Sequence, residues 1–418
     1  MRIRKEVQKL SWKAELMAVG QNQTSFYPVS GIRIASVNAG ISNSDTSDLV
    51  LFELCPGSQV VGVFTQSHFS AAPVQVARQH LAEVSAQYLV VNTGNANAAT
   101  GDQGLADARA CCQAVAEHGG VLAKQVLPFS TGVIGEPLPV KRLLDGLPDL
   151  FAGLGEQRWL DAAMGILTTD TRPKIASRQL QLCGQIVTIT GIAKGAGMIQ
   201  PNMATMLSFI ATDAQISEPL LQMMLASAVA SSFNRITVDS DTSTNDACML
   251  MASAQSGVVL DNHLQEMADF QDALTDLMLE LAQGLVRDGE GASKFVTVHV
   301  EKGESQEQCL AIAFSIANSP LIKTALFASD ANWGRIVMAI GKTDVPLSVD
   351  SLEIYINDIC LMRSGSKALE YKESDGANAM IEEEIVIRVV LNCGDCDDTV
   401  WTSDLSHDYV KINAEYRT

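Results

Sequence analysis

Basic residues are scarce in this 418-residue chain. Lys and Arg number 29 against 48 Asp and Glu, which gives a formal net charge of −19. Because nucleic-acid binding needs a basic footprint that neutralises phosphates, this balance argues against DNA or RNA as a partner. Small molecules or other proteins are therefore the expected ligands.

Long apolar runs are also missing. No window approaches the ~18 apolar residues of a membrane span, and the basic start, residues 1–16, lacks the uninterrupted apolar stretch of a secretory signal. We therefore expect a cytoplasmic protein that does not bind membranes. Its nine scattered cysteines are expected to be reduced thiols, because without a signal peptide they form no disulfide framework.

Metal-ligand patterns are almost absent. The single C-x-x-C, Cys393 to Cys396, has no second pair and no nearby His, so it would make half of a zinc site at most. A turn at a strand end is the preferred interpretation, and no metal is expected.

No internal repeat, low-complexity run or Pro/Ser-rich linker divides the chain. Its 418 residues, 47% of them hydrophobic and 18% charged, suffice for two domains or one large unit with a sizeable core. Short β-rich runs alternate with helical patterns, which predicts an α/β or mixed α+β fold. The clearest runs predict strands at 89–91, 186–189 and 384–390, and helices at 104–117 and 218–233.

Residues 258–286 predict a further helix in the core. Apolar residues recur there at spacings of three or four, which places them on one helical face. That face comprises Leu264, Met267, Phe270, Leu274, Met278, Leu281 and Leu285.

Four polar or glycine-rich stretches break this pattern, at residues 92–101, 130–136, 191–205 and 234–246. Loops held by a rigid scaffold are where function concentrates. The first stretch could turn backbone amides towards an anion at a helix N-terminus, but a structural turn is favoured. The fourth carries three Asp within eight residues and could hold a hard cation, but a polar loop satisfied by its own Asx turns is favoured.

The six histidines lie outside all four stretches and no G-x-S-x-G elbow occurs, so a Ser-His-Asp triad is poorly supported. A threonine needs no histidine when it stands at a chain N-terminus, because its own α-amino group, with a pKa of ~7.7–8.0, is the base. The third stretch ends at Thr205, directly before an apolar strand. Thr205 would first have to attack the carbonyl of Ala204, and water would then open the resulting ester. In the second stretch, Thr131-Gly132 could offer a hydroxyl and a backbone N–H to an oxyanion.

The stretch Gly191–Asp213, GIAKGAGMIQPNMATMLSFIATD, closely resembles the ornithine acetyltransferase (glutamate N-acetyltransferase) family of arginine biosynthesis. Residues 1–30 and 391–403 depart from the family pattern. Further matching blocks keep the family's order across nearly the whole chain: TGNANAATGDQGLADARA at Thr93–Ala110, STGVIGEPLP at Ser130–Pro139, LTTDTRPK at Leu167–Lys174, NRITVDSDTSTND at Asn234–Asp246, DGEGASKF at Asp288–Phe295, ASDANWGRI at Ala328–Ile336 and YVKINAEYRT at Tyr409–Thr418.

The resemblance implies cleavage between Ala204 and Thr205, giving an α chain of residues 1–204 and a β chain of residues 205–418. It implies an α/β fold of the family's own type, related to self-processing aminopeptidases, and an oligomer that we expect to be an α2β2 heterotetramer. The nucleophile would be Thr205 and the oxyanion donors Thr131 and Gly132. The implied contacts to the amino-acid substrate are Thr168, Lys194, Thr205, Glu290, Asn413 and Thr418.

The reaction implied by the resemblance is the transfer of an acetyl group from N-acetylornithine to glutamate through an acetyl-threonine, without a bound cofactor. Some family members also take acetyl-CoA as donor, and the sequence leaves this open. Two alternatives remain. One is a self-processing aminopeptidase or amidase that uses the same threonine with water as acyl acceptor, and the less favoured one is a catalytically silent binding protein with the same fold.

Overall fold

The computed structural model describes residues 26–42, 46–200 and 206–415, and these form two compact units. In the described ranges the large unit comprises residues up to 234 together with 242–285, and the small unit comprises 235–241 together with residues from 286 onwards. Both units contain sheets and helices. The predicted mixed α+β class is therefore confirmed.

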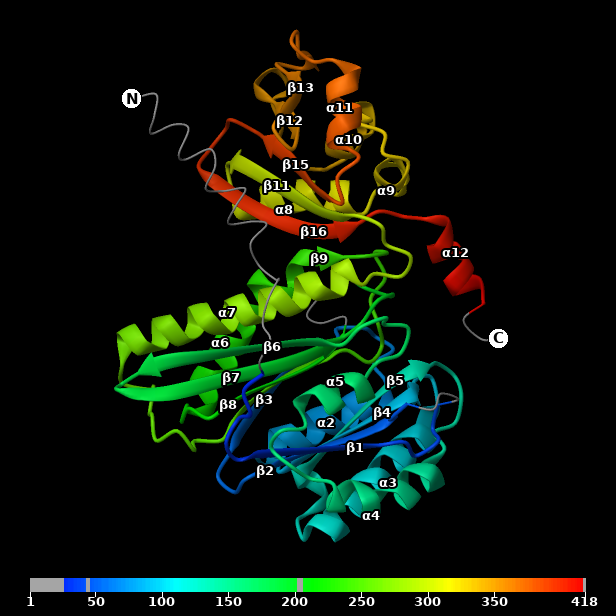
Figure 1. Ribbon diagram of the computed structural model, residues 1–418, viewed down its shortest axis with the longest axis vertical. Coiled ribbons are helices and arrows are strands. Elements are labelled where there is room, and N and C mark those ends of the chain that lie inside the picture. The colour runs from blue at the N-terminus through cyan, green and yellow to red at the C-terminus, as the bar shows by residue number, and fades with distance from the viewer. Residues whose placement is uncertain (1–25, 43–45, 201–205, 416–418) are drawn as a thin grey trace. The chain divides into compact units, whose positions relative to one another are not determined.

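Two sheets form the centre of the large unit (Figure 1). Their strand orders are β1-β2-β4-β5 and β3-β10-β8-β7-β6. Within them β4 pairs with β5, and β8 with β10, in parallel, and the other neighbours are antiparallel. The strands are β1 Ile32–Val37, β2 Leu49–Leu54, β3 Gln59–Phe64, β4 Tyr88–Asn95, β5 Val126–Val133, β6 Lys174–Leu182, β7 Gln185–Lys194, β8 Leu207–Thr212 and β10 Ala247–Ala252.

The two sheets pack face to face over an apolar core. Side chains alternate along β2 with the strand period of two, so that Val50 and Phe52 enter this core while Leu49 and Leu51 enter another on the opposite face. Phe52 stacks on Phe209 of the second sheet with ring centroids 5.0 Å apart. The ends of strands from both sheets are thereby fixed relative to each other.

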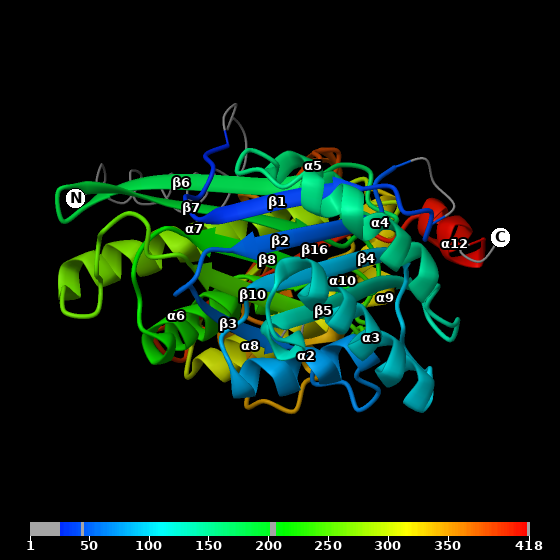
Figure 2. The same ribbon diagram turned by 90° about the horizontal axis from the view of Figure 1, so that it is seen from below.

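Helices cover the outer faces of the two sheets, which gives four layers (Figures 1 and 2). Three helices bury their apolar sides against the first sheet, and two others lie on the second, where Leu277 and Leu281 pack close to Gly191 of β7. The helices of this unit are α2 Ala72–Glu83, α3 Gly101–Gly119, α4 Val140–Ala152, α5 Trp159–Gly165, α6 Glu218–Ser231 and α7 Leu264–Arg287, with short 3-10 turns η1 Ala123–Gln125 and η2 Phe233–Arg235.

The predicted elements match the structure with corrections at their ends. The helix predicted over 104–117 lies within α3, the one predicted over 218–233 is α6, which stops at Ser231, and the strand predicted at 384–390 is observed with those bounds. The helix predicted from 258 begins only at Leu264, because a turn closed by His263 N donating to Leu260 O precedes it. Its apolar face is buried from Phe270 onwards, but Leu264 is 84% exposed, so the prediction was wrong there.

The small unit is built on a seven-stranded sheet of order β14-β13-β12-β15-β11-β16-β9. One face of this sheet packs under helices in a single apolar core. The strands are β9 Ile236–Thr237, β11 Phe295–Gly303, β12 Glu353–Ile356, β13 Ile359–Arg363, β14 Ser366–Lys367, β15 Glu384–Val390 and β16 Cys396–Ser403. The helices are α8 Gln306–Ala317, α9 Pro320–Phe327, α10 Trp333–Gly341, α11 Glu373–Ala379 and α12 His407–Ala414, with the 3-10 turn η3 Val349–Ser351.

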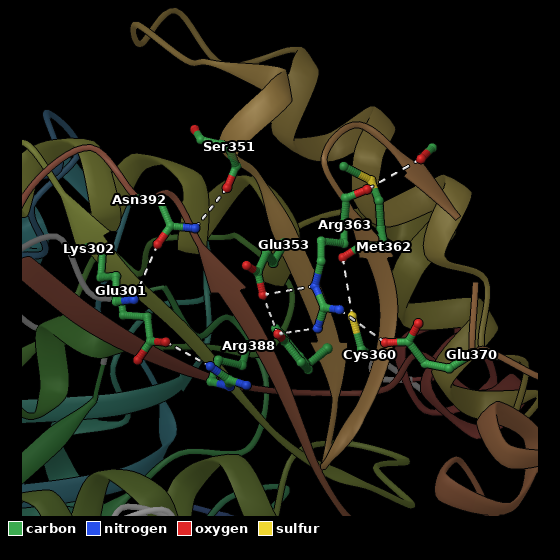
Figure 3. Close-up of polar contacts among 12 residues, drawn as sticks. Glu301, Lys302, Ser351, Glu353, Cys360, Met362, Arg363, Glu370, Arg388 and Asn392 are labelled. Atoms are coloured by element: carbon green, nitrogen blue, oxygen red, sulfur yellow. Dashed lines mark hydrogen bonds and ion pairs between the residues drawn. The ribbon is translucent and has the colours of Figure 1, made fainter. Parts of the chain in front are cut away.

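The opposite face of the small unit's sheet carries a row of paired polar side chains (Figure 3). Arg388 Nη1 donates to Glu301 Oε1 at 2.7 Å, and its guanidinium lies 3.9 Å from the ring centroid of Tyr355, its cross-strand neighbour. Arg363 pairs with Glu370 at 3.1 Å. The Arg363–Glu370 pair is about half exposed, and pairs as exposed as this contribute little to stability.

No single helix in the described part of the chain is long and apolar enough to cross a membrane. The bent pair α8 and α9, which meet at 57°, reaches that length and composition only when both are taken together.

Candidate active site

The predicted oxyanion donors, Thr131 and Gly132, lie at the end of β5, where it runs beside β4. Gly132 faces Gly94 in the parallel register, with φ at +136°. A Cβ at this position would lie 2.3 Å from the carbonyl carbon of Gly94. Close strand approach and backbone conformation therefore both require glycine after Thr131.

Buried amide side chains fix the loops around this strand end. Asn245 Nδ2 donates to Ala96 O at 2.6 Å and to Ser130 O at 2.9 Å. Asn95 Nδ2 donates to Glu136 O at 3.1 Å. These bonds fix the backbone on either side of Thr131 and Gly132, and such preorganisation is what the predicted role as oxyanion donors would require.

The first polar stretch forms a structural turn, the interpretation favoured from the sequence. Asn97 Nδ2 donates to Gly104 O at 3.0 Å and Thr100 Oγ1 donates to Asn97 Oδ1 at 2.8 Å, so the loop's side chains bond to the start of α3 and to each other.

Lys194 is the last residue of β7 and is only 9% exposed. Its Nζ donates to Thr131 Oγ1 at 3.1 Å. The two residues come from different sheets and are 63 positions apart in the sequence. The structure thus brings together two of the predicted site residues, the cation Lys194 and the hydroxyl of Thr131.

Thr168 is linked to the same region through Asp170. The carboxylate of Asp170 accepts hydrogen bonds from the backbone N–H of Thr168 at 3.1 Å and from that of Gly195 at 2.7 Å. Asp170 was not predicted as a site residue, although it lies inside the LTTDTRPK block.

Asp246 is a second buried carboxyl near Lys194 that sequence reasoning missed. It directly precedes β10, where Ala247 N donates to Met206 O at 2.9 Å. In the described part of the chain its Oδ2 has no hydrogen-bond partner. Burial raises the pKa of Asp246 well above its usual value, against the opposing effects of Ser243 and Lys194.

In the small unit, the predicted residues Glu290 and Asn413 contact each other. Asn413 Nδ2 donates to Glu290 Oε2 at 2.7 Å and to Tyr409 O at 3.0 Å, and the Tyr409 hydroxyl donates to Asp239 Oδ2 at 3.2 Å. Helix α12 therefore holds Asn413 against the loop that carries Glu290.

Three predicted site residues, Ala204, Thr205 and Thr418, lie outside the described residues. The described chain resumes at Met206, which is buried and leads directly into β8.

Among the described residues, neither sequence that could have held a metal forms a group of three ligating side chains. Cys396 begins β16 and Cys393 Sγ donates to Lys302 O at 3.5 Å, which is the expected strand-end turn. Asp239 is bonded to Tyr409, and Asp241 N donates to Asp239 Oδ1 at 3.4 Å in an Asx turn. Among the described residues, the one group of three metal-ligating side chains is elsewhere, at Cys183, His263 and Glu266.

The sequence from residue 33 to residue 418 matches the model of the ArgJ family. The chain belongs to the ArgJ family. It is 49% identical over 406 residues to the arginine biosynthesis bifunctional protein ArgJ of Pseudomonas fluorescens (strain Pf0-1), a match that covers 96% of this chain and 100% of the relative. A second relative of the same description, from Pseudomonas syringae pv. tomato, is also 49% identical over 406 residues, with the same coverage.

Two solved ArgJ-type structures are also similar to this chain. One is the arginine biosynthesis bifunctional protein of Bacillus halodurans, with 36% identity and a TM-score of 0.47, covering 49% of this chain and 96% of that one. The other is the ornithine acetyltransferase of Mycobacterium tuberculosis complexed with ornithine, with 35% identity and a TM-score of 0.38, covering 42% of this chain and 94% of that one. Membership of the ArgJ family confirms the resemblance found in the sequence blocks.

Proposed function

We propose that this ArgJ-family enzyme transfers an acetyl group from N-acetylornithine to glutamate, and that Thr205 becomes its nucleophile after the bond between Ala204 and Thr205 is cut. The observation that carries the proposal is the 3.1 Å contact between Lys194 Nζ and Thr131 Oγ1. It joins a cation that suits a substrate carboxylate to a hydroxyl that suits an oxyanion, beside the strand that follows Thr205 in the sequence.

In the proposed first half-reaction, the hydroxyl of Thr205 attacks the acetyl carbonyl of N-acetylornithine while its proton passes to the α-amino group of Thr205. Thr131 and Gly132 stabilise the negative oxygen of the tetrahedral intermediate. The C–N bond then breaks as the α-amino group returns the proton, and ornithine leaves. The product is an acetyl ester on Thr205.

In the second half-reaction, the amine of glutamate attacks this ester and gives N-acetylglutamate and free Thr205. The acetyl group is thus conserved, and no bound cofactor takes part. Thr168, Lys194, Glu290, Asn413 and Thr418 remain the proposed contacts to the amino-acid substrates, because their types suit a zwitterion with additional charged groups.

Intact-mass spectrometry tests the nucleophile and the donor together. The purified protein should give two fragments that meet at Ala204/Thr205, and brief exposure to N-acetylornithine should add one acetyl group to the Thr205 fragment. The Thr205→Ala variant should show neither event, and an uncut chain that never takes up acetyl would refute the mechanism.

Adding glutamate separates the proposal from the hydrolytic alternative. The acetyl-enzyme should discharge to N-acetylglutamate, whereas an aminopeptidase or amidase would release acetate at the same rate with or without glutamate. The Pseudomonas relatives are described as bifunctional. We therefore also propose acetyl-CoA as a second donor, which isotope-labelled acetyl-CoA tests directly. The proposed α2β2 assembly is tested by light scattering.

A further inference from the structure

A buried ion pair lies at the base of the hairpin formed by β6 and β7. Lys174, the first residue of β6, donates to Asp170 Oδ1, and their side chains are 3% and 0% exposed. A buried pair of this kind costs much of its Coulombic gain in desolvation, so it is weak evidence for a stabilising role. Its further contacts indicate what other role the pair has.

Both members of the pair also bind backbone groups next to predicted site residues. Asp170 accepts from the N–H of Thr168 at 3.1 Å and from the N–H of Gly195 at 2.7 Å, while Lys174 Nζ donates to Gly195 O at 3.3 Å. Both backbone polar groups of Gly195, the residue that follows Lys194, are thus bonded to the pair. Gly195 has φ at +150°, a backbone conformation that residues with a Cβ rarely adopt.

The charge of Asp170 also acts on Lys194. Burial alone would raise the pKa of Asp170, but the nearby charges of Lys194 and Lys174 outweigh it and bring the pKa to about 2. The carboxylate is therefore ionised at neutral pH and faces two cations, one through a hydrogen bond and one through space. Lys194 in turn donates to Thr131.

We propose that the Asp170–Lys174 pair is a positioning device that fixes Thr168 and Lys194 for binding the carboxylate of the amino-acid substrate. The inference rests on the proposed acetyl transfer. Asp170 and Lys174 touch no reacting atom in it and act only through the residues that they hold.

The test compares KM with kcat for N-acetylornithine in full-length Asp170→Asn. The amide has a single acceptor oxygen, so it can keep one of the two backbone hydrogen bonds, from Thr168 or from Gly195, and it leaves Lys174 and Lys194 without this counter-charge. We expect KM to rise at least about tenfold, the usual order for loss of a charge-assisted contact, and kcat to fall much less. In a direct titration, the affinity of the variant for ornithine should be lower than that of the wild type by a similar factor.

A second variant separates positioning from folding. Asp170→Asn combined with Lys174→Met removes both buried charges, so thermal stability should recover towards wild type while KM stays high. A merely structural pair would make KM and stability recover together, and that result would overturn the inference.

The matched control lies on the same strand. Arg178 of β6 donates to Glu280 of α7 at 2.6 Å and contacts none of the predicted site residues. Arg178→Met should leave KM unchanged. A wild-type KM in Asp170→Asn, or an equal change in both variants, would refute the positioning role in an enzyme that is active. A wild-type protein that transfers no acetyl group would instead refute the proposed function, and with it the inference.

Discussion

Position 132 requires glycine because the neighbouring strand leaves no room for a side chain. Its Cβ would meet the backbone of Gly94 at 2.3 Å, and the backbone of β4 cannot move aside as a flexible side chain could. We predict that Gly132→Ala lowers kcat by about 100-fold, the order found when one oxyanion donor is lost. Steady-state kinetics on cleaved enzyme measures this.

Gly135 offers the control for that substitution. It also has positive φ, at +85°, but no atom lies within 4 Å of its Cβ position. Gly135→Ala should therefore cost stability of the order of ~1 kcal/mol and leave kcat near that of the wild type. A Gly132→Ala enzyme with normal kcat would show that the strand contact does not position an oxyanion donor at Gly132, as we propose.

Residues whose chemistry is visible in a motif could be predicted from the sequence. Residues whose role depends on a partner far away in the sequence could not. Thr131 and Lys194 were both predicted, each from its own loop, and they meet in the structure. Asn245 was missed because its partner Ala96 is 149 positions away. A polar residue in a polar loop has the same sequence pattern whether it is solvated or buried, so the buried carboxyls of Asp170 and Asp246 could not be distinguished from surface ones.

Helix α9 places a lysine where water does not reach. Ser319 caps the helix by accepting from Ile322 N, and Pro320 occupies the first turn. Lys323 then points into the small unit, where Nζ donates to Thr402 Oγ1 at 2.8 Å and to Ser403 O. Burial lowers the pKa of Lys323 from 10.5 to about 7, although the charges of Asp404 and Asp239 oppose the shift.

This shift predicts how stability depends on pH. Between pH 7 and 10.5 the unfolded chain keeps the proton on Lys323 while the folded chain has released it, so the free energy of unfolding rises with pH in this window. Below pH 7 both states are protonated and the full cost of the buried charge remains. In urea unfolding experiments, the free energy of unfolding of Lys323→Met should rise less between pH 7 and 10.5 than that of the wild type.

An exposed lysine of the same unit serves as the reference. Replacement of Lys342, just after α10, by Met should leave the slope of the free energy of unfolding against pH unchanged. Equal slopes in wild type and Lys323→Met between pH 7 and 9 would contradict a lysine that is neutral in the folded protein.

The period of apolar residues predicted where single helices and strands lie better than it predicted which strands are neighbours in a sheet. The 3.6-residue pattern located α7 because its buried face recurs over several turns, but it extended the helix past the turn at Leu260. No pattern indicated that β10, residues 247–252, lies between β3 and β8. Strand order depends on long-range pairing, which the period of side chains along one strand does not encode.

At the scale of the whole molecule, the proposed cut divides the strands of one sheet between two pieces. Residues 1–204 contribute β3, β6 and β7, and residues 205–418 contribute β8 and β10, in the order β3-β10-β8-β7-β6. Each piece therefore pairs with the other along two ladders, β10 with β3 and β8 with β7.

We predict that the two pieces stay together after cleavage. They should elute as one species in native size-exclusion chromatography, at the position of the uncut Thr205→Ala variant, and separate only in denaturant. Pieces that part in plain buffer would show that this sheet does not hold them.

The interleaved sheet also predicts that, after the proposed cleavage, unfolding is hard to reverse. The intact precursor folds by a unimolecular reaction, since all five strands belong to one chain. Once cut and unfolded, the same sheet can re-form only when two separate molecules meet, so refolding becomes second order and its yield falls on dilution. If the chain is cut as proposed, the covalent continuity of the precursor therefore assists folding once, as an intramolecular chaperone would, and is then lost.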